Sequence, residues 1–182
     1  MNRTSKKNIM IRRITCCAVL IALGIVLPFL TGQIPEVGSA LSPLHIPALL
    51  AGFVVGPVWG AIASFIIPIL RSALFTMPPM FPMACTMAFE MAVYAAVGGI
   101  LSRAFPKKII WVYVAQIAAM LAGRIVYGIV FALFTVNNPD ISYTFTAFIL
   151  GCFAEAVPGI VLHLLIVPPI VTALRKAKLT AE

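Results

Sequence analysis

The sequence predicts an all-α integral membrane protein, a single domain (1–182) of six transmembrane helices. Three observations lead to this fold class. Hydrophobic residues make up 62% of the chain and charged residues only 10%, and the mean hydropathy is +1.10, which is more apolar than a soluble domain of this length. The apolar residues form runs long enough to cross a bilayer, for which about 20 residues suffice. The basic residues gather at the flanks of these runs.

The first predicted span covers residues 14–30 and follows a basic N-terminal segment, 1–13. The next stretch, 31–44, contains Glu36 together with glycine and proline, so we expect a loop or a short re-entrant segment there. A cleavable signal peptide is the alternative for the first span, because Gly38-Ser39-Ala40 loosely matches a cleavage site.

The apolar run 45–75 is too long for one helix and is interrupted at Gly56-Pro57, where a helix should stop. It therefore predicts a short second helix and a third one. A proline-rich connection, 77–82, separates the third helix from the fourth. The fourth predicted helix ends near residue 102, the fifth covers 109–135 and the sixth covers 143–174.

Three basic clusters set the predicted orientation. With six crossings and both termini in the cytoplasm, all three clusters lie on the cytoplasmic side, as the positive-inside rule requires. The net charge of +8 is thus explained by helix flanks, and we expect no nucleic-acid partner. The clusters are Arg3, Lys6, Lys7, Arg12 and Arg13; Arg103, Lys107 and Lys108; and Arg175, Lys176 and Lys178.

Four charged residues, Arg71, Glu90, Arg124 and Glu155, interrupt the apolar runs. A charge at the centre of a membrane helix costs roughly 2.5–3.5 kcal/mol on insertion scales, so it usually faces a partner, water or a ligand. Counting along the helices places Arg71 near Glu90 and Arg124 near Glu155. The four side chains either line one substrate cavity that opens outward or form two internal salt bridges that hold the helices together.

Three further residues are candidate substrate contacts. His45 stands at the outer start of the second helix. Tyr94 and Tyr127 lie one turn below Glu90 and Arg124 and should face the same way. His163, by contrast, is expected to pack against a carbonyl or another helix.

The chain lacks the motifs of the common enzyme classes that act at membranes. There is no phosphate-binding G-x-x-x-x-G-K-[ST], no H-E-x-x-H and no G-x-S-x-G, and the cysteines lack metal-ligand spacing. We therefore expect neither an enzyme nor a metal site, but a binding protein or a conduit.

The order of motifs along the chain resembles the substrate-binding S components of energy-coupling factor (ECF) vitamin transporters. The resemblance covers nearly the whole chain and rests on two small residues in the first helix and on a series of motifs in the next three. The motifs are Ala18 and Ala22, the run 45–53 (HIPALLAGF), Gly56-Pro57, Gly60, Pro68, Arg71, Met77-Pro78-Pro79, Phe81-Pro82 and Met87-Ala88-Phe89-Glu90.

This resemblance implies a substrate-capture subunit in the plasma membrane of a prokaryote. It would bind a water-soluble vitamin or precursor, of riboflavin, pantothenate or pyridoxine type, between the outer ends of helices four to six, under a capping loop formed by 31–44. Ala18 and Ala22 would dock onto a transmembrane T component driven by two ABC ATPases. ATP would be used by those ATPases, and this chain would carry no cofactor.

Two other functions are compatible with the residues alone. A standalone small channel or proton-coupled carrier would use Glu90 or Glu155 as its titrating group. A structural membrane subunit without a ligand would keep both Arg–Glu pairs as internal bridges. Transport that strictly requires an ATPase module would separate the first alternative from an S component.

Overall fold

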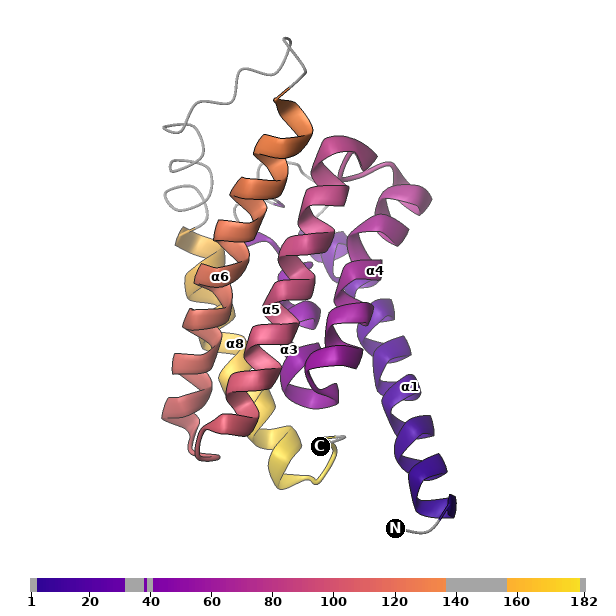
Figure 1. Ribbon diagram of the computed structural model, residues 1–182, viewed down its shortest axis with the longest axis vertical. Helices are drawn as coiled ribbons and strands as arrows, with labels where there is room; N and C mark the ends of the chain where they lie inside the picture. The colour runs from indigo at the N-terminus through magenta and orange to yellow at the C-terminus, as the bar shows by residue number, and fades with distance from the viewer. Residues whose placement is uncertain (1–2, 32–37, 39–40, 137–156, 181–182) are drawn as a thin grey trace.

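The computed structural model describes residues 3–31, 38, 41–136 and 157–180. They form a bundle of helices without any strand in this described part, so the all-α prediction is confirmed (Figure 1). Five helices are long and apolar enough to cross a membrane, and a sixth is shorter. The elements are α1 (Arg3–Val26), η1 (Leu27–Thr31), α3 (His45–Val55), α4 (Pro57–Phe75), η2 (Met80–Ala84), α5 (Cys85–Ala104), α6 (Ile109–Thr135) and α8 (Val157–Lys176).

Helix α1 begins eleven residues before the predicted span, at Arg3 rather than at residue 14. Lysine and arginine are good helix formers, and their long side chains can reach the membrane surface, so the basic segment continues the helix. The α-helix ends at Val26 and gives way to the 3₁₀ turn η1. Pro28 explains the change, because its ring lacks an N–H and clashes with the carbonyl four residues earlier.

The predicted interruption at Gly56-Pro57 is confirmed, since α3 ends at Val55 and α4 begins at Pro57. Gly56 has φ +100°, a value that favours glycine. Two further glycines let the backbones around this turn approach closely. A Cβ at Gly52 would collide with the backbone of Ala95, and one at Gly99 with the backbone of Pro57.

Helix α3 is short and completely enclosed. Its 11 residues are all buried, and they span about 16 Å, roughly half of a hydrocarbon core. Its C-terminal end lies at Gly56, beneath the guanidinium of Arg103. The N-terminal residue, His45, therefore lies inside the bundle and only 3% exposed, whereas the sequence suggested a position at the outer surface.

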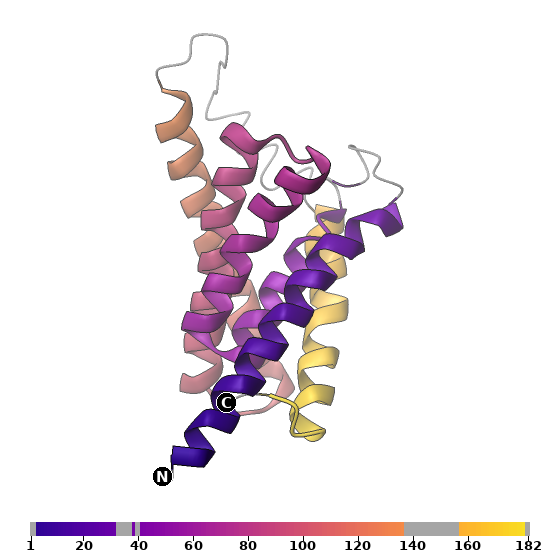
Figure 2. The ribbon, with the colours of Figure 1, turned by 90° about the vertical axis from the view of Figure 1, so that its right-hand side faces the viewer.

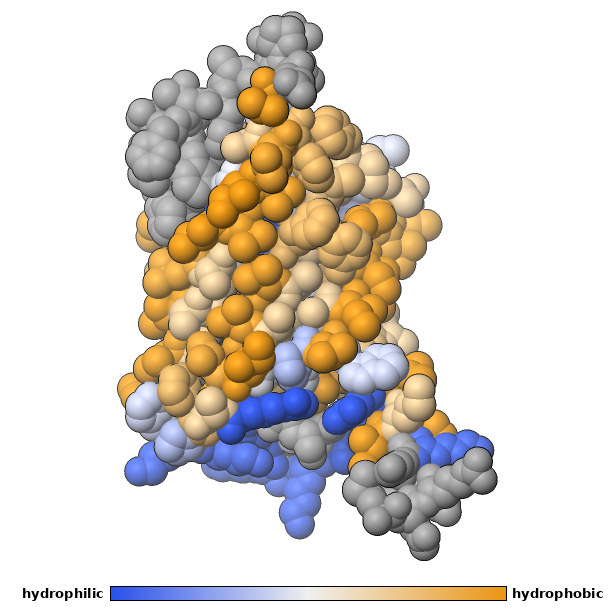
Figure 3. Space-filling model, in the orientation of Figure 1, coloured by the Kyte–Doolittle hydropathy of each residue, from blue (hydrophilic) through white to orange (hydrophobic). Residues whose placement is uncertain are grey.

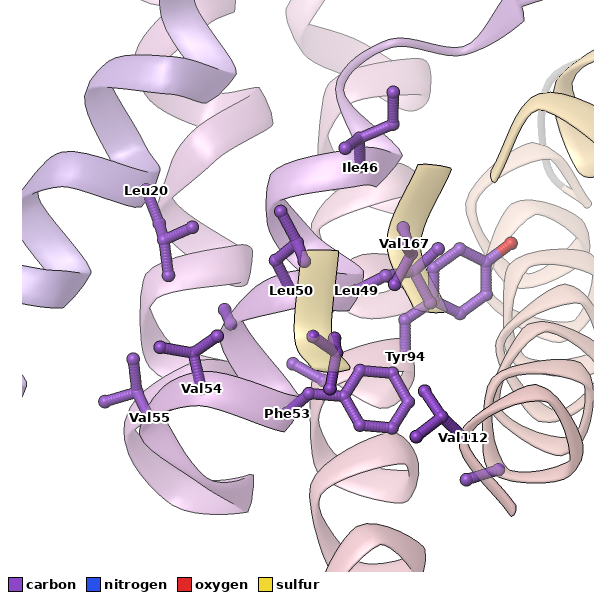
Figure 4. Close-up of a cluster of buried hydrophobic side chains, with 14 of the residues drawn as sticks. Leu20, Ile46, Leu49, Leu50, Phe53, Val54, Val55, Tyr94, Val112 and Val167 are labelled. Carbon is purple, nitrogen blue, oxygen red and sulfur yellow. The ribbon is translucent and has the colours of Figure 1, made fainter. Parts of the chain in front are cut away.

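The main core surrounds α3. Apolar side chains of α3 pack against side chains of α1, α5, α6 and α8. Figure 4 shows several members of this core, including Leu20 of α1, Phe53 of α3 and Val167 of α8. The ring of Tyr94 lies among these apolar groups, while its hydroxyl points away from them (Figure 4). This core fixes the positions of α3 and α5 relative to each other, and the polar site depends on these positions.

Both termini and the connection between α5 and α6 lie at one end of the bundle (Figures 1 and 2). Hydrophilic residues gather at this end, while the side of the bundle seen in Figure 3 is mostly hydrophobic. The chain segments that hold the three predicted basic clusters thus lie at the same end of the bundle, as the predicted topology requires. For the sixth predicted helix, 143–174, the structure describes α8, and residues 143–156 lie outside the described part.

Candidate functional site

Glu90 is the centre of a buried polar cluster. Its side chain is 1% exposed, yet it meets side chains from three helices. Tyr94 Oη donates a hydrogen bond of 2.6 Å to Glu90 Oε1, and Arg124 Nη1 lies 3.2 Å from the same oxygen. His45 Nε2 lies 3.4 Å from Glu90 Oε2. We call these four residues the Glu90 cluster.

Local helix geometry explains how these side chains meet. Glu90 and Tyr94 are four residues apart on α5 and therefore share a face. Arg124 comes from the neighbouring α6. Gly123 precedes it, and a Cβ at this position would collide with the ring of Tyr94, so glycine is what allows the tyrosine to lie between α5 and α6. His45 reaches the cluster because α3 begins inside the bundle.

The carbonyl oxygen of Ser42 connects the Glu90 cluster with a second histidine, His163. His45 Nδ1 lies 3.2 Å from this oxygen, and His163 Nε2 from α8 lies 3.1 Å from it. Ser42 has φ +45°, a left-handed backbone conformation that is uncommon for residues other than glycine. The ring centroids of His45 and His163 are 5.9 Å apart. The end of the segment 31–44 is thus joined to Glu90 through His45.

Arg71 has different partners. Its Nη1 donates a hydrogen bond of 2.7 Å to the carbonyl of Ile25, one of the carbonyls that the end of α1 leaves without a helical partner. Its guanidinium carbon lies 5.3 Å from the ring centroid of Phe29 and 5.4 Å from that of Phe75, within the range of cation–π attraction. Arg71 therefore links α4 to the start of the segment 31–44.

The predicted pairing of the charges is wrong in one respect. Among the described residues, Glu90 pairs with Arg124 and His45 and not with Arg71. Counting residues along a helix gives depth but not which neighbouring helix a side chain faces, so it did not show that Glu90 meets Arg124 rather than Arg71. Glu155, the predicted partner of Arg124, lies outside the described residues.

The two predicted tyrosines differ in position. Tyr94 faces Glu90 as expected, one turn closer to the end of the bundle that holds the termini. Helix α6 runs in the opposite direction, so Tyr127 lies one turn from Arg124 toward the other end and not below it as predicted. It stacks on Phe131, with ring centroids 5.8 Å apart and an interplanar angle of 17°, and it is half-buried.

His163, Ser42 and Gly123 are the residues of this site that the sequence did not indicate. His163 was expected to pack against a carbonyl or another helix, and the structure shows the contact with a carbonyl, but its position next to His45 depends on tertiary packing. A polar residue inside an apolar run was the available signal for it. No pattern marked Ser42 or Gly123.

Outside the cluster, Ala18 and Ala22 lie exposed on α1. They share this surface with large apolar side chains, including Val19 and Val26, which are 54% and 58% exposed. In the part of the chain that the structure describes, no group of three or more His, Cys, Asp or Glu side chains could hold a metal ion. The Glu90 cluster thus brings a carboxylate, a guanidinium, a phenol and an imidazole together inside the bundle.

Comparison with known proteins gives one match. The family model described as the substrate-specific component of ECF transporters matches residues 12–171, which include α3, α4, α5, α6 and every described residue of the Glu90 cluster. No curated protein and no solved structure matches the chain significantly.

Proposed function

The chain belongs to the family of substrate-specific components of ECF transporters, and from this premise we propose that it captures a water-soluble vitamin or vitamin precursor at the Glu90 cluster. Proteins of this family are membrane-embedded binding proteins and not enzymes, and they pair with a T component and ATPases. Family membership also favours a subunit of an ATP-driven importer over a standalone channel or carrier. We place this subunit in the plasma membrane of a prokaryote.

The buried position of Glu90 is the observation that supports this site most strongly. A carboxylate at membrane depth is costly, and here polar side chains from three helices meet it: His45 of α3, Tyr94 of α5 and Arg124 of α6. Such convergence of polar groups in an otherwise apolar body is typical of a small-molecule site. We propose His45, Glu90, Tyr94 and Arg124 as substrate contacts, with Tyr127 and Glu155 as further predicted contacts.

We propose that the segment 31–44 caps the bound substrate. The residues flanking it are held to the bundle at both ends. Arg71 binds the carbonyl of Ile25 and lies against Phe29 at its start, and the two histidines meet Ser42 at its end. A substrate that changes the contacts of Glu90 would act on the second anchor through His45. The direct contact of Arg71 with substrate stays a prediction.

The partner surface is proposed to include Ala18 and Ala22. Small side chains permit close approach of another helix inside a membrane, and both alanines lie on the outward-facing side of α1. We propose that this surface meets the T component, which is driven by two ABC ATPases. Cofactor chemistry is not needed in this chain, because ATP is used by those ATPases.

Thermal unfolding of the detergent-purified protein with a panel of B vitamins and their precursors tests the proposal. A ligand that binds only the folded state raises the melting temperature by mass action, so we expect one of riboflavin, pantothenate, pyridoxine or a related compound to do so. Ile125→Trp on the exposed face of α6, where Ile125 is 59% exposed, should keep this response as a control. A folded wild-type protein that no compound stabilises would contradict the proposal.

A further inference from the structure

One ring nitrogen of His163 contacts a carbonyl oxygen, and the other has no hydrogen-bond partner in the part of the chain that the structure describes. The residue is 2% exposed. Its Nε2 lies 3.1 Å from the carbonyl oxygen of Ser42, while its Nδ1 is buried and has no hydrogen-bond partner among the described residues. Buried polar atoms in folded proteins are nearly always paired, so an exception calls for an explanation.

The chemistry of the two nitrogens determines what kind of partner is missing. A carbonyl oxygen only accepts hydrogen bonds, so Nε2 must carry the hydrogen in its contact with Ser42. In the neutral imidazole, Nδ1 is then an acceptor without a donor. Placing a second proton there would bury a charged donor without a partner, which costs more than leaving an acceptor unpaired. The missing partner is therefore a hydrogen-bond donor.

The position of His163 connects this acceptor with the Glu90 cluster. Its ring centroid lies 5.9 Å from that of His45, whose Nε2 is in contact with Glu90. Helix α8 is thus the fourth helix, after α3, α5 and α6, that places a polar side chain in this region.

We propose that His163 is a further substrate-contacting residue and that the substrate donates an N–H or O–H hydrogen bond to its Nδ1. This inference rests on the proposed function and narrows its substrate class to molecules with such a donor near the group that meets the Glu90 cluster. A site that hydrogen-bonds a donor of its ligand discriminates strongly against analogues without it, because the buried acceptor would stay unpaired.

Two substitutions separate this role from simple anchoring of Ser42. His163→Asn keeps an acceptor oxygen at the position of Nδ1 but cannot reach Ser42. His163→Gln keeps a donor at the position of Nε2 for Ser42 but places nothing at Nδ1. The dissociation constant of the strongest stabiliser in the vitamin panel is measured for the wild type and both variants, together with the melting temperature of each ligand-free protein.

We expect His163→Gln to weaken binding about 5- to 150-fold, the range for an unpaired buried polar group, and His163→Asn to bind more tightly than His163→Gln. If His163→Gln binds as tightly as His163→Asn or more tightly, the inference is overturned and His163 acts only on Ser42. If no compound binds the wild type, the proposed function fails and the role of His163 fails with it.

A measurement on the wild type covers the case in which a variant does not fold. Nitrogen NMR of histidine-labelled protein should show Nδ1 of His163 unprotonated and should show its signal move on addition of the same stabiliser, because accepting a hydrogen bond changes its shielding. An unchanged Nδ1 signal at saturating ligand would overturn the inference.

Discussion

Glu90 is the residue on which the proposed binding site depends most. One oxygen accepts from Tyr94 and pairs with Arg124, and the other contacts His45. Because the partners come from α3, α5 and α6, removing the carboxylate affects three helices together. Two arginine–glutamate pairs that only lock helices were an alternative, and affinity measurements on variants separate locking from binding.

Replacing the carboxylate by an amide tests this directly. We expect Glu90→Gln to lower the free energy of unfolding by about 3 kcal/mol, because Arg124 loses its buried counter-charge, and to weaken binding of the vitamin at least tenfold. Tyr94→Phe removes the hydrogen bond to Glu90 and should cost about 1 kcal/mol. Chemical unfolding and ligand titration of both variants give the values; unchanged affinity in Glu90→Gln would assign the cluster to structure alone.

Gly123 gives a second prediction at the level of single residues. A methyl group there collides with the ring of Tyr94, so Gly123→Ala should move the tyrosine away from Glu90 and weaken vitamin binding, with a loss of about 1–3 kcal/mol in stability. Gly98→Ala on α5 is the matched control, because the nearest atom to its Cβ would be a ring carbon of Phe53 at 3.5 Å. Equal effects of the two variants would argue against this position for Tyr94.

Among the elements, α3 shows where sequence-based reasoning succeeded and where it stopped. Gly56-Pro57 marks the end of the helix and His45 its beginning, and both limits agree with the structure. Its enclosure could not be predicted, because a short apolar run looks the same whether it meets lipid or other helices. As a result, His45 was placed at the surface, although it lies inside the bundle.

The sequence allowed some residues of the candidate site to be predicted, but not how they pair. Charges inside apolar runs are visible in any sequence, and Tyr94 follows Glu90 at helical spacing. The rotation of the helices about their axes decides which arginine meets Glu90. It also brings Ser42 and His163 together, although they are 121 residues apart in the sequence. That rotation is set by close contacts such as those at Gly52, Gly99 and Gly123.

Helix α1 carries the prediction about the partner. Ala18→Trp combined with Ala22→Trp should abolish vitamin uptake by the assembled transporter while leaving the affinity of the isolated chain within about threefold, because two bulky rings prevent close helix approach. The control, Ile125→Trp, places the same ring on exposed α6 and should preserve uptake. Loss of vitamin binding in the α1 variant would count against a docking role.

For the whole molecule, composition and charge distribution predicted the membrane-embedded helical bundle. The basic clusters, far apart in sequence, gather at the end of the bundle that holds both termini (Figures 1–3). Within this end, Arg175 Nη2 donates a hydrogen bond of 2.5 Å to Ser102 Oγ, and Arg12 bonds the carbonyl of Lys178. By the positive-inside rule we assign this end to the cytoplasm, which places the Glu90 cluster closer to the outer side.

Uptake of the stabilising vitamin into proteoliposomes tests the proposed function most directly. The chain is reconstituted alone or with its T component and ATPases, with and without ATP inside the compartment where the ATPases act, and with a pH gradient as a separate condition. We expect accumulation only with the complete assembly and ATP, and none with Glu90→Gln at low vitamin concentration. Accumulation by the chain alone, driven by the pH gradient, would contradict the proposal and identify a proton-coupled carrier.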